Sequence, residues 1–291
     1  MGEHIAEKAP AKLNLSLDVL GRLEGGYHAL RMVMESVSFG DTLEITLRKD
    51  GEIRLETGLA WLPRDGRNLA VEAARVFREA LGEETLGADI LLTKRIPVGA
   101  GMGGGSADAA AVLRGLNRLT GRPFDGEKLR ELGLAIGSDV PYCVCGGSRL
   151  AEGRGEVLSP LPMPPECRVV IAKPSFSIST ASLFARIDGR AGRTRPDTAG
   201  MIGAMEQGDL GGVARRMFNV FEDVLPRSCR DVGAVRSALL DHGALGAVMT
   251  GTGSAVFGLF AGDGEAQKAA VALRSLCRDV TVTEFVGEIE V

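Results

Sequence analysis

A glycine-rich segment is the part of this 291-residue chain best suited to chemistry. Residues 97–111 read PVGAGMGGGSADAAA, with five glycines among the seven residues from 99 to 105. Glycine lets a backbone come close to a ligand, and the alanine-rich stretch that follows predicts a helix whose positive end faces the same loop. Free N–H groups at a helix N-terminus favour an anion such as phosphate. We therefore predict a phosphate-binding loop made of Pro97, Val98, Gly99, Ala100, Gly101, Met102, Gly103, Gly104, Gly105, Ser106 and Ala107.

Three well-known phosphate-binding patterns do not account for this loop. The spacing Gly99-x-Gly101-x-x-Gly104 fits the dinucleotide fingerprint, but that fold needs a following strand that ends in an acidic residue. Asp125 lies near the right distance, yet the sequence before it leads into another helix. The chain has no Gly-Lys-Ser or Gly-Lys-Thr for a Walker A loop, and no His-Arg-Asp or Asp-Phe-Gly of a protein kinase. A merely flexible connection is the remaining alternative.

Four residues outside this loop have types and settings that suit a reaction on a bound ligand. Asp139 stands between a Gly-Ser pair and an apolar Val-Pro pair, so its carboxylate either caps a turn or acts as a base. Lys12 precedes a strand-like segment, and it is either a solvated lysine or a partner that keeps a carboxylate ionised. Tyr27 and His28 follow a double glycine, and adjacent rings on a turn suit stacking on a base and binding to its edge.

The composition narrows the classes of function. Lys and Arg number 34 against 38 Asp and Glu, which gives a formal charge of −4. No cluster of Lys and Arg residues stands out that would indicate nucleic-acid binding. No apolar run reaches the ~18–20 residues that span a bilayer, and the first ten residues lack the apolar core of a signal peptide. We therefore expect a cytoplasmic protein without a nucleic-acid or membrane partner. The stretch 186–195 is basic but interrupted by Gly and Asp, which predicts a surface loop.

The five cysteines are predicted to be free thiols and not metal ligands. Their number is odd, and the pair Cys143 and Cys145 has neither a second pair nor a nearby histidine to complete a zinc site. We therefore expect no metal held by protein side chains of this kind. Residues 140–145 alternate in a way that predicts a buried strand, in which cysteine serves as a small apolar residue.

Hydrophobic patterns in the first half predict the elements that must position these residues. Asn68 is the predicted N-cap of a helix that runs to about residue 81, and Asp125 precedes another helix. Asp50-Gly51 is predicted to be a hairpin turn that joins two strands. The predicted strands are 13–20, 32–39, 43–47, 53–56 and 88–94, and the predicted helices are 69–81, 106–119 and 126–136.

A proline-rich stretch at 157–166 is the predicted boundary between two lobes, residues 1–160 and 161–291. The fold class predicted from all these elements is α+β. In the second lobe the predicted strands are 168–172, 247–250, 255–260 and 280–286, and the predicted helices are 180–187, 198–207, 210–218, 231–242 and 265–276.

Five motifs resemble those of the GHMP small-molecule kinases, in the same order along the chain. The glycine-rich loop, APAKLNL at 9–15 and TGTGSAVF at 250–257 resemble motifs of the whole superfamily. GGYH at 25–28 and GSDVP at 137–141 resemble the branch that phosphorylates 4-diphosphocytidyl-2-C-methyl-D-erythritol in the non-mevalonate isoprenoid route. The sequence departs from the usual pattern at Met102, where Leu is common, at Ala107, where a second Ser is common, and at the Tyr142-Cys143 pair.

The resemblance implies a two-lobed fold, with an N-terminal lobe like domain 2 of ribosomal protein S5 and a ferredoxin-like C-terminal lobe. It implies ATP as phosphate donor, with Mg²⁺ bridging the triphosphate oxygens, and a cytidine diphosphate-linked methylerythritol as substrate. Asp139 would accept the hydroxyl proton and Lys12 would support it. The other roles it implies are stacking on cytosine for Tyr27 and Phe184, contact with its polar edge for His28, substrate binding for Asn14, phosphate or magnesium contact for Ser106, and contact on the adenine side for Asn68 and Lys94.

Two rival functions remain at this stage. Another kinase of the superfamily, acting on homoserine, mevalonate or a sugar, does not need a cytosine pocket, so residues 25–28 argue against it. A nucleotide-binding regulator without turnover has no physical need for both Lys12 and Asp139. We expect a monomer or a homodimer.

Overall fold

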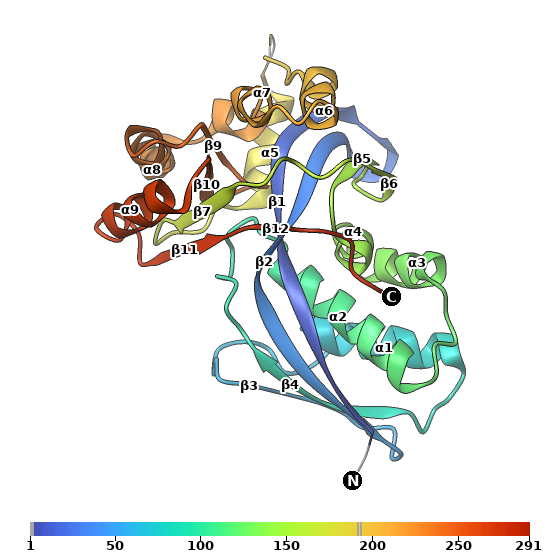
Figure 1. The fold of residues 1–291 in the computed structure, drawn as a ribbon. Coiled ribbons are helices and arrows are strands. Elements are labelled where there is room, and N and C mark those ends of the chain that lie inside the picture. The colour runs from blue at the N-terminus through green and yellow to red at the C-terminus, as the bar shows by residue number, and fades with distance from the viewer. Residues whose placement is uncertain (1–2, 191, 193) are drawn as a thin grey trace.

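Two β-sheets with helices packed on them make up the protein in a computed structural model, which describes residues 3–190, 192 and 194–291 (Figure 1). Strands β1 (His4–Arg22) and β2 (His28–Arg48) form a long antiparallel pair that runs through the molecule. The prediction of two strands separated near residue 40 is wrong. A Cβ on Gly40 would lie 2.4 Å from the carbonyl oxygen of Ala9, so this glycine marks a close approach of the two strands and not a turn.

The predicted hairpin at Asp50-Gly51 is also wrong, because β4 (Gly87–Thr93) lies between β2 and β3 (Ile53–Thr57). Ala88, Ile90 and Leu92 of β4 are almost fully buried, whereas β3 is less apolar and takes the edge. Five strands of this sheet are hydrogen-bonded side by side in the order β3-β4-β2-β1-β8, where β8 is Phe218–Asn219. The remaining strands of this sheet are β5 (Arg149–Gly153) and β12 (Phe285–Val286), which pair with β2, and β6 (Val157–Pro160), which pairs with β5.

Helix α2 (Gly104–Leu119) lies against β1 and β2 and is buried along most of its length. It begins two residues earlier than predicted. Helices α1 (Leu69–Leu81) and α3 (Gly126–Ile136) pack beside it, and both predicted N-caps are confirmed. The Asn68 side chain accepts a hydrogen bond from the Ala70 N–H, and Asp125 accepts one from Lys128.

Residues 140–145 form helix α4 (Val140–Cys145), so the predicted strand is wrong. Because all six residues are buried, the pattern of their side chains does not distinguish a strand from a helix. Pro141 suits the first turn of a helix. The five cysteines are buried free thiols, as predicted. Burial raises the pKa of Cys143 above its ordinary range and that of Cys167 to about 12, so these thiols are structural.

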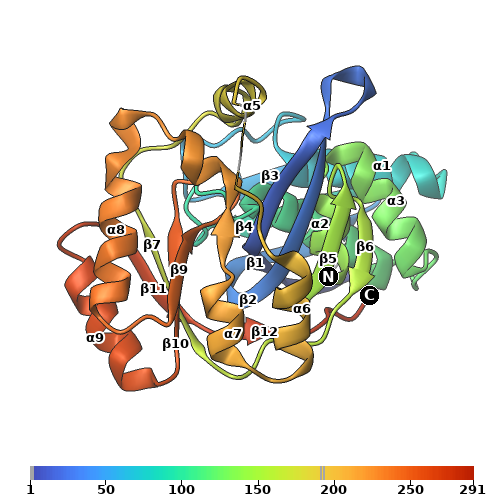
Figure 2. The same cartoon turned by 90° about the horizontal axis from the view of Figure 1, so that it is seen from above.

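The second sheet has four antiparallel strands in the order β11-β7-β10-β9, with α8 and α9 packed against it (Figures 1 and 2). This β-α-β-β-α-β order is the expected ferredoxin-like arrangement. The predicted helices are confirmed, with ends that differ by three residues or fewer. The elements are β7 (Arg168–Lys173), α5 (Thr180–Asp188), α6 (Thr198–Glu206), α7 (Leu210–Arg215), α8 (Arg230–Asp241), β9 (Gly246–Met249), β10 (Val256–Phe260), α9 (Asp263–Leu273) and β11 (Asp279–Thr283).

The strand predicted at 280–286 is two strands that belong to different sheets, β11 and β12. The predicted loop at 186–195 overlaps α5 as far as Asp188, and its positions 191 and 193 lie outside the described residues. Three short 3₁₀ turns complete the elements, at Glu24–Gly26, Val220–Val224 and Arg227–Cys229. None of the helices in the described part of the chain is both long enough and apolar enough to span a membrane.

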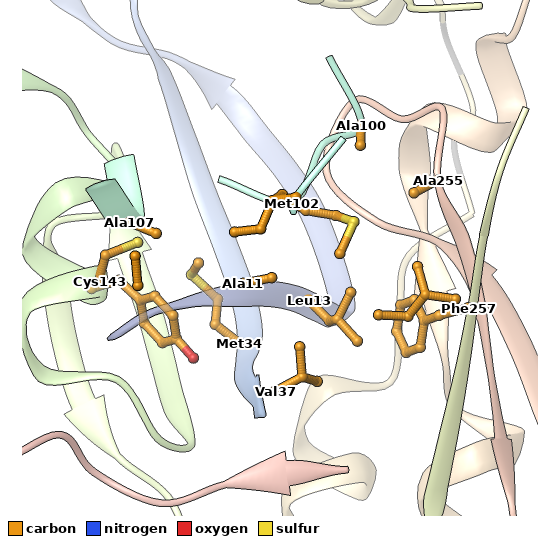
Figure 3. Close-up of a cluster of buried hydrophobic side chains, with 14 of the residues drawn as sticks. Ala11, Leu13, Met34, Val37, Ala100, Met102, Ala107, Cys143, Ala255 and Phe257 are labelled. Carbon is orange, nitrogen blue, oxygen red and sulfur yellow. The ribbon is translucent and has the colours of Figure 1, made fainter. Parts of the chain in front are cut away.

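One buried cluster joins the two sheets to the glycine-rich loop. Figure 3 shows Met102 of this loop together with Ala11 and Leu13 of β1 and Phe257 of β10. Met102 is 1% exposed, so the unusual methionine occupies an apolar position that its flexible side chain fills. The loop is therefore anchored in the core as well as open to a ligand.

Candidate active site

A cavity of about 920 Å³ is lined by residues from both halves of the chain. Its wall includes the turn between β1 and β2, the glycine-rich loop, the start of α4, helix α5 and residues 251–253. This size is typical of a site that encloses a small molecule. The residues singled out from motifs far apart in the sequence therefore surround one space.

The glycine-rich loop has a backbone conformation that requires glycine. Gly99, Gly101 and Gly103 have φ angles of 68°, 77° and 67°, in the left-handed region that other residues rarely adopt. Gly103 is the N-cap of α2, and residues 103–106 line the cavity, so the helix N-terminus opens on it. Free N–H groups at this end of α2 are suited to holding phosphate oxygens.

A second glycine turn, residues 250–253, holds this loop in place. A Cβ on Gly101 would lie 2.3 Å from the Thr250 carbonyl oxygen and 2.8 Å from the Gly253 nitrogen. The N–H of Ala255 donates a hydrogen bond to the Ala100 carbonyl at 3.1 Å. The two glycine motifs are thus one structural unit, although some 150 residues of sequence separate them.

Replacing Gly101 by Ala should lower the free energy of unfolding by at least about 1–2 kcal/mol, because a left-handed alanine alone costs that much. The added methyl group also collides with the 250–253 turn, so the loop must shift and the KM for ATP should rise. Denaturant unfolding and initial rates measure the two effects. Gly233→Ala is the control: this glycine lies inside α8 with open space around it, so alanine should stabilise by about 0.5–1 kcal/mol. Equal stability of both variants would contradict this account of the loop.

Lys12 and Asp139 face each other across the cavity wall. The Lys12 ammonium lies 3.7 Å from Oδ2 of Asp139, with side-chain exposures of 6% and 35%. Asp139 occupies the N-cap of α4, yet its side chain makes no capping hydrogen bond. Its carboxylate is therefore held beside a buried cation and remains open to the cavity, which is the setting a proton acceptor needs.

Asn14 lies behind Lys12 and is not part of the cavity wall. Its Oδ1 accepts hydrogen bonds from the Lys12 ammonium at 2.8 Å and from the Gly251 N–H at 3.0 Å. Its Nδ2 points at the sulfur of Met32. These contacts tie Asn14 to Lys12 and to the 250–253 turn, and contact of Asn14 with a substrate stays a prediction.

A buried cluster of one lysine and two carboxylates lies under the loop. The Lys94 ammonium is 2.5 Å from Asp41 and 2.7 Å from Asp108, and all three side chains are at most 6% exposed. Asp41 also accepts the N–H groups of Arg95 and Ile96. Burial raises the pKa of Asp108 to about 8, because two carboxylates share one cation in a poorly solvated place. The cluster ties β2, the end of β4 and α2 together.

Aromatic residues gather at the other end of the cavity. Tyr27 is half exposed, and the Arg154 guanidinium lies 4.5 Å from its ring centre. His28 stacks on Phe184, with ring centroids 4.4 Å apart and an angle of 26° between the planes. The structure thus brings the three rings singled out from the sequence to one end of the cavity, and His28 already covers one face of Phe184.

Most of the predicted site residues line the cavity, and two do not. Ala107 and Asn14 are buried behind the wall. Asn68 lines it, but both ends of its amide are used, by the Ala70 N–H and the Pro63 carbonyl. The predicted residues found in the wall are Lys12, Tyr27, His28, Asn68, Lys94, Pro97, Val98, Gly99, Ala100, Gly101, Met102, Gly103, Gly104, Gly105, Ser106, Asp139 and Phe184.

Several polar residues of the wall were missed. Arg154 and Asp188 reach the wall only through the folding of distant segments, and their local sequences carry no signal for it. The same holds for Asp41, which lies behind the wall and contacts Lys94. Thr252 belongs to a glycine motif that was noticed, so its place in the wall could have been expected. The sequence thus pointed to the loop and to the Lys12–Asp139 pair that line the cavity, and overlooked the side chains that support them.

Comparisons with known proteins agree with this geometry. The family description "GHMP kinases N terminal domain" matches residues 68–147, and "GHMP kinases C terminal" matches residues 201–279. The chain is 42% identical to a 4-diphosphocytidyl-2-C-methyl-D-erythritol kinase from Exiguobacterium sibiricum, over 98% of this chain and 99% of that one. It is 40% identical to the enzyme of the same name from Bacillus subtilis, over 98% of each chain.

Solved structures show the same similarity. A crystal structure of 4-(cytidine 5'-diphospho)-2C-methyl-D-erythritol kinase is 32% identical, with a TM-score of 0.83, and the match covers 97% of this chain and 100% of that one. A homoserine kinase from Cytophaga hutchinsonii shares the fold at 22% identity, with a TM-score of 0.79 and coverage of 99% and 96%.

Proposed function

This chain belongs to the GHMP kinase family, and we propose that it transfers the γ-phosphoryl group of ATP to the 2-hydroxyl of 4-diphosphocytidyl-2-C-methyl-D-erythritol. The products are ADP and the 2-phosphate, and the reaction belongs to the non-mevalonate route to isoprenoid precursors. The observation that carries the proposal is that one cavity holds a glycine-rich loop, a Lys–Asp pair and an aromatic cluster. These three parts match the donor phosphates, the acceptor hydroxyl and the base of such a substrate.

Phosphoryl transfer depends chiefly on positioning and on charge stabilisation. In the proposed mechanism the loop N–H groups hold the triphosphate at the N-terminus of α2. Asp139 accepts the proton of the attacking hydroxyl, since its carboxylate faces the cavity without a capping partner. Lys12, 3.7 Å from this carboxylate, offsets negative charge on the transferred group. Asn14 fixes the direction of the Lys12 ammonium.

Magnesium bound with ATP would neutralise part of the triphosphate charge. The N-terminal part of α2 fits a cation there, because Ser106 and Asp108 both line the cavity and Oδ1 of Asp108 is buried without a hydrogen-bond partner among the described residues. We expect the triphosphate oxygens to supply most of the ligands, as is usual for Mg²⁺. On the adenine side of ATP, we propose contact with the wall around Asn68 and Lys94.

The aromatic cluster favours the cytidyl substrate over those of related kinases. Homoserine and mevalonate carry no base to stack on Tyr27 or to bind His28. The fold alone does not decide between these substrates, since the homoserine kinase named above shares it. The proposal therefore rests on the chemistry of residues 25–28 and of α5 in the cavity wall.

Replacing Tyr27 by Ala should raise the KM for the cytidyl substrate by about 5- to 150-fold, the range that corresponds to loss of one base–aromatic stack. The KM for ATP should change little, because Tyr27 lies at the aromatic end of the cavity. Initial rates with each substrate varied in turn measure both constants. Tyr27→Phe keeps the ring and is the matched control. Equal increases in both KM values would refute the stacking role.

A further inference from the structure

Asp188, at the end of α5, connects the two halves of the chain at the aromatic end of the cavity. Its Oδ1 lies 2.8 Å from Nε2 of His28, at the start of β2. Its Oδ2 accepts two hydrogen bonds from Arg22, at the end of β1, at 2.8 and 2.5 Å. Figure 2 shows α5 beside the β1–β2 turn, and all three residues line the cavity. The carboxylate therefore has a separate partner for each oxygen.

The orientation of the His28 ring is fixed by packing on one face, in addition to the contact of its Nε2 with Asp188. Phe184 covers one face at a centroid distance of 4.4 Å, and Phe184 itself meets the edge of Phe221 at 5.0 Å. The His28 side chain is only 9% exposed. Neither ring can turn without losing this packing, so the remaining freedom of His28 is the choice of which ring nitrogen carries the proton.

The carboxylate of Asp188 decides that choice. Hydrogen bonds from Arg22, and then from His28, lower the pKa of Asp188, so it is an ionised acceptor at neutral pH. A carboxylate cannot donate, and Nε2 of His28 must therefore carry the hydrogen of the 2.8 Å contact. In the neutral ring Nδ1 is then an acceptor, and it makes no hydrogen bond within the described residues.

We propose that Asp188 is a positioning residue for base recognition, which holds His28 in its Nε2–H form so that Nδ1 accepts a hydrogen bond from the amino group of cytosine. Uracil carries an oxygen acceptor in place of this amino group, so the fixed acceptor disfavours it. This inference rests on the proposed function, because it assigns a role within the cytidyl pocket. Within the described residues, the Asp188 carboxylate forms hydrogen bonds with His28 and Arg22, at the end of the cavity away from the Lys12–Asp139 pair.

The kinetic test is Asp188→Asn, assayed with the cytidyl substrate and with its uridyl analogue. Asn can either donate to Nε2 or accept from it, so His28 gains access to both neutral forms. The ratio of kcat/KM for cytidyl over uridyl substrate should fall about tenfold, the loss expected for one hydrogen bond. The change should lie in the KM for the cytidyl substrate, with kcat and the KM for ATP nearly constant. An unchanged ratio would overturn the proposal.

Arg22→Gln is the matched control, because it removes the other partner of Asp188 and leaves the contact with His28. The ratio of kcat/KM for cytidyl over uridyl substrate in Arg22→Gln should stay close to that of the unaltered protein if Asp188 acts through His28. An equal fall in Arg22→Gln and Asp188→Asn would show instead that the carboxylate serves only to tether α5 to the β1–β2 turn, and the proposal would fail.

Nitrogen-15 NMR of the histidine rings gives a readout that does not depend on activity. The chain has three histidines, so His28→Gln identifies the signal of His28. In the unaltered protein above pH 8 the signal should be that of the Nε2–H form, and in Asp188→Asn it should shift towards a mixture. A signal of the Nδ1–H form in the unaltered protein would overturn the inference. Absence of turnover with the cytidyl substrate, by contrast, would count against the proposed function itself.

Discussion

Replacing Asp139 by Asn should lower kcat by about 10²–10⁴-fold, the contribution expected of a well-placed general base. The amide keeps the shape of the side chain but cannot accept the hydroxyl proton. The start of α4 should be unaffected, because Asp139 makes no capping hydrogen bond that the substitution would weaken. The measurement is single-turnover phosphoryl transfer, together with direct titration of ATP binding, which should be nearly normal.

Asp125→Asn is the control for this result. Asp125 is also an N-cap aspartate, in α3, but its carboxylate accepts the Lys128 N–H and lies outside the cavity wall. Asparagine caps helices about as well as aspartate, so stability and turnover should both stay near normal. Near-normal turnover in Asp139→Asn, with ATP still bound, would refute the assignment of Asp139 as the base.

Replacing Lys94 by Met should destabilise the protein by about 3–5 kcal/mol, the cost of leaving a buried charge without its partner. Lys94 is the ammonium group between Asp41 and Asp108, and all three side chains are almost completely buried. Denaturant unfolding measures the loss. The control is Lys128→Met, which removes an exposed ion pair with Glu131 and should cost about 0–1 kcal/mol. Similar losses in both variants would contradict the structural role of the cluster.

The loss of stability in Lys94→Met should also depend on pH. The pKa of Asp108 is raised by burial to about 8 in the folded protein, from 3.8 in the absence of burial, so folding takes up a proton between these values. The stability that this carboxyl group contributes is therefore greatest in acid and falls as the pH rises through about 8. Without Lys94 the Asp108 carboxylate loses its hydrogen-bond donor and is relieved by protonation, so the loss of stability should be larger at pH 9 than at pH 5.

The loop and its helix could be predicted because their signals are local. A run of glycines before an alanine-rich stretch permits a left-handed loop and marks the helix start within a few residues, and the φ angles of Gly99, Gly101 and Gly103 bear this out. The same holds for the caps Asn68 and Asp125, whose side chains bond to N–H groups two or three residues ahead. The resemblance to a known family then connected motifs that lie far apart in the chain.

What could not be predicted depends on contacts between distant segments. The cluster of Lys94, Asp41 and Asp108 requires the register of β2 against β4, and the sequence near residue 50 pointed to a different pairing. Residues 140–145 are buried on all sides, so their alternation did not distinguish a strand from a helix. The contacts of Asn14 could not be predicted either, because its partners Lys12 and Gly251 come from opposite ends of the chain.

ADP release in the presence of ATP and a panel of acceptors is the most direct test of the central claim. The panel is 4-diphosphocytidyl-2-C-methyl-D-erythritol, mevalonate and homoserine, each assayed over a range of concentrations. Our account predicts that kcat/KM for the cytidyl substrate exceeds the other two by about 10³-fold or more, as expected where a site forms hydrogen bonds to a group that the other acceptors lack. Faster release with mevalonate or homoserine, or no release with any of the three, would contradict it.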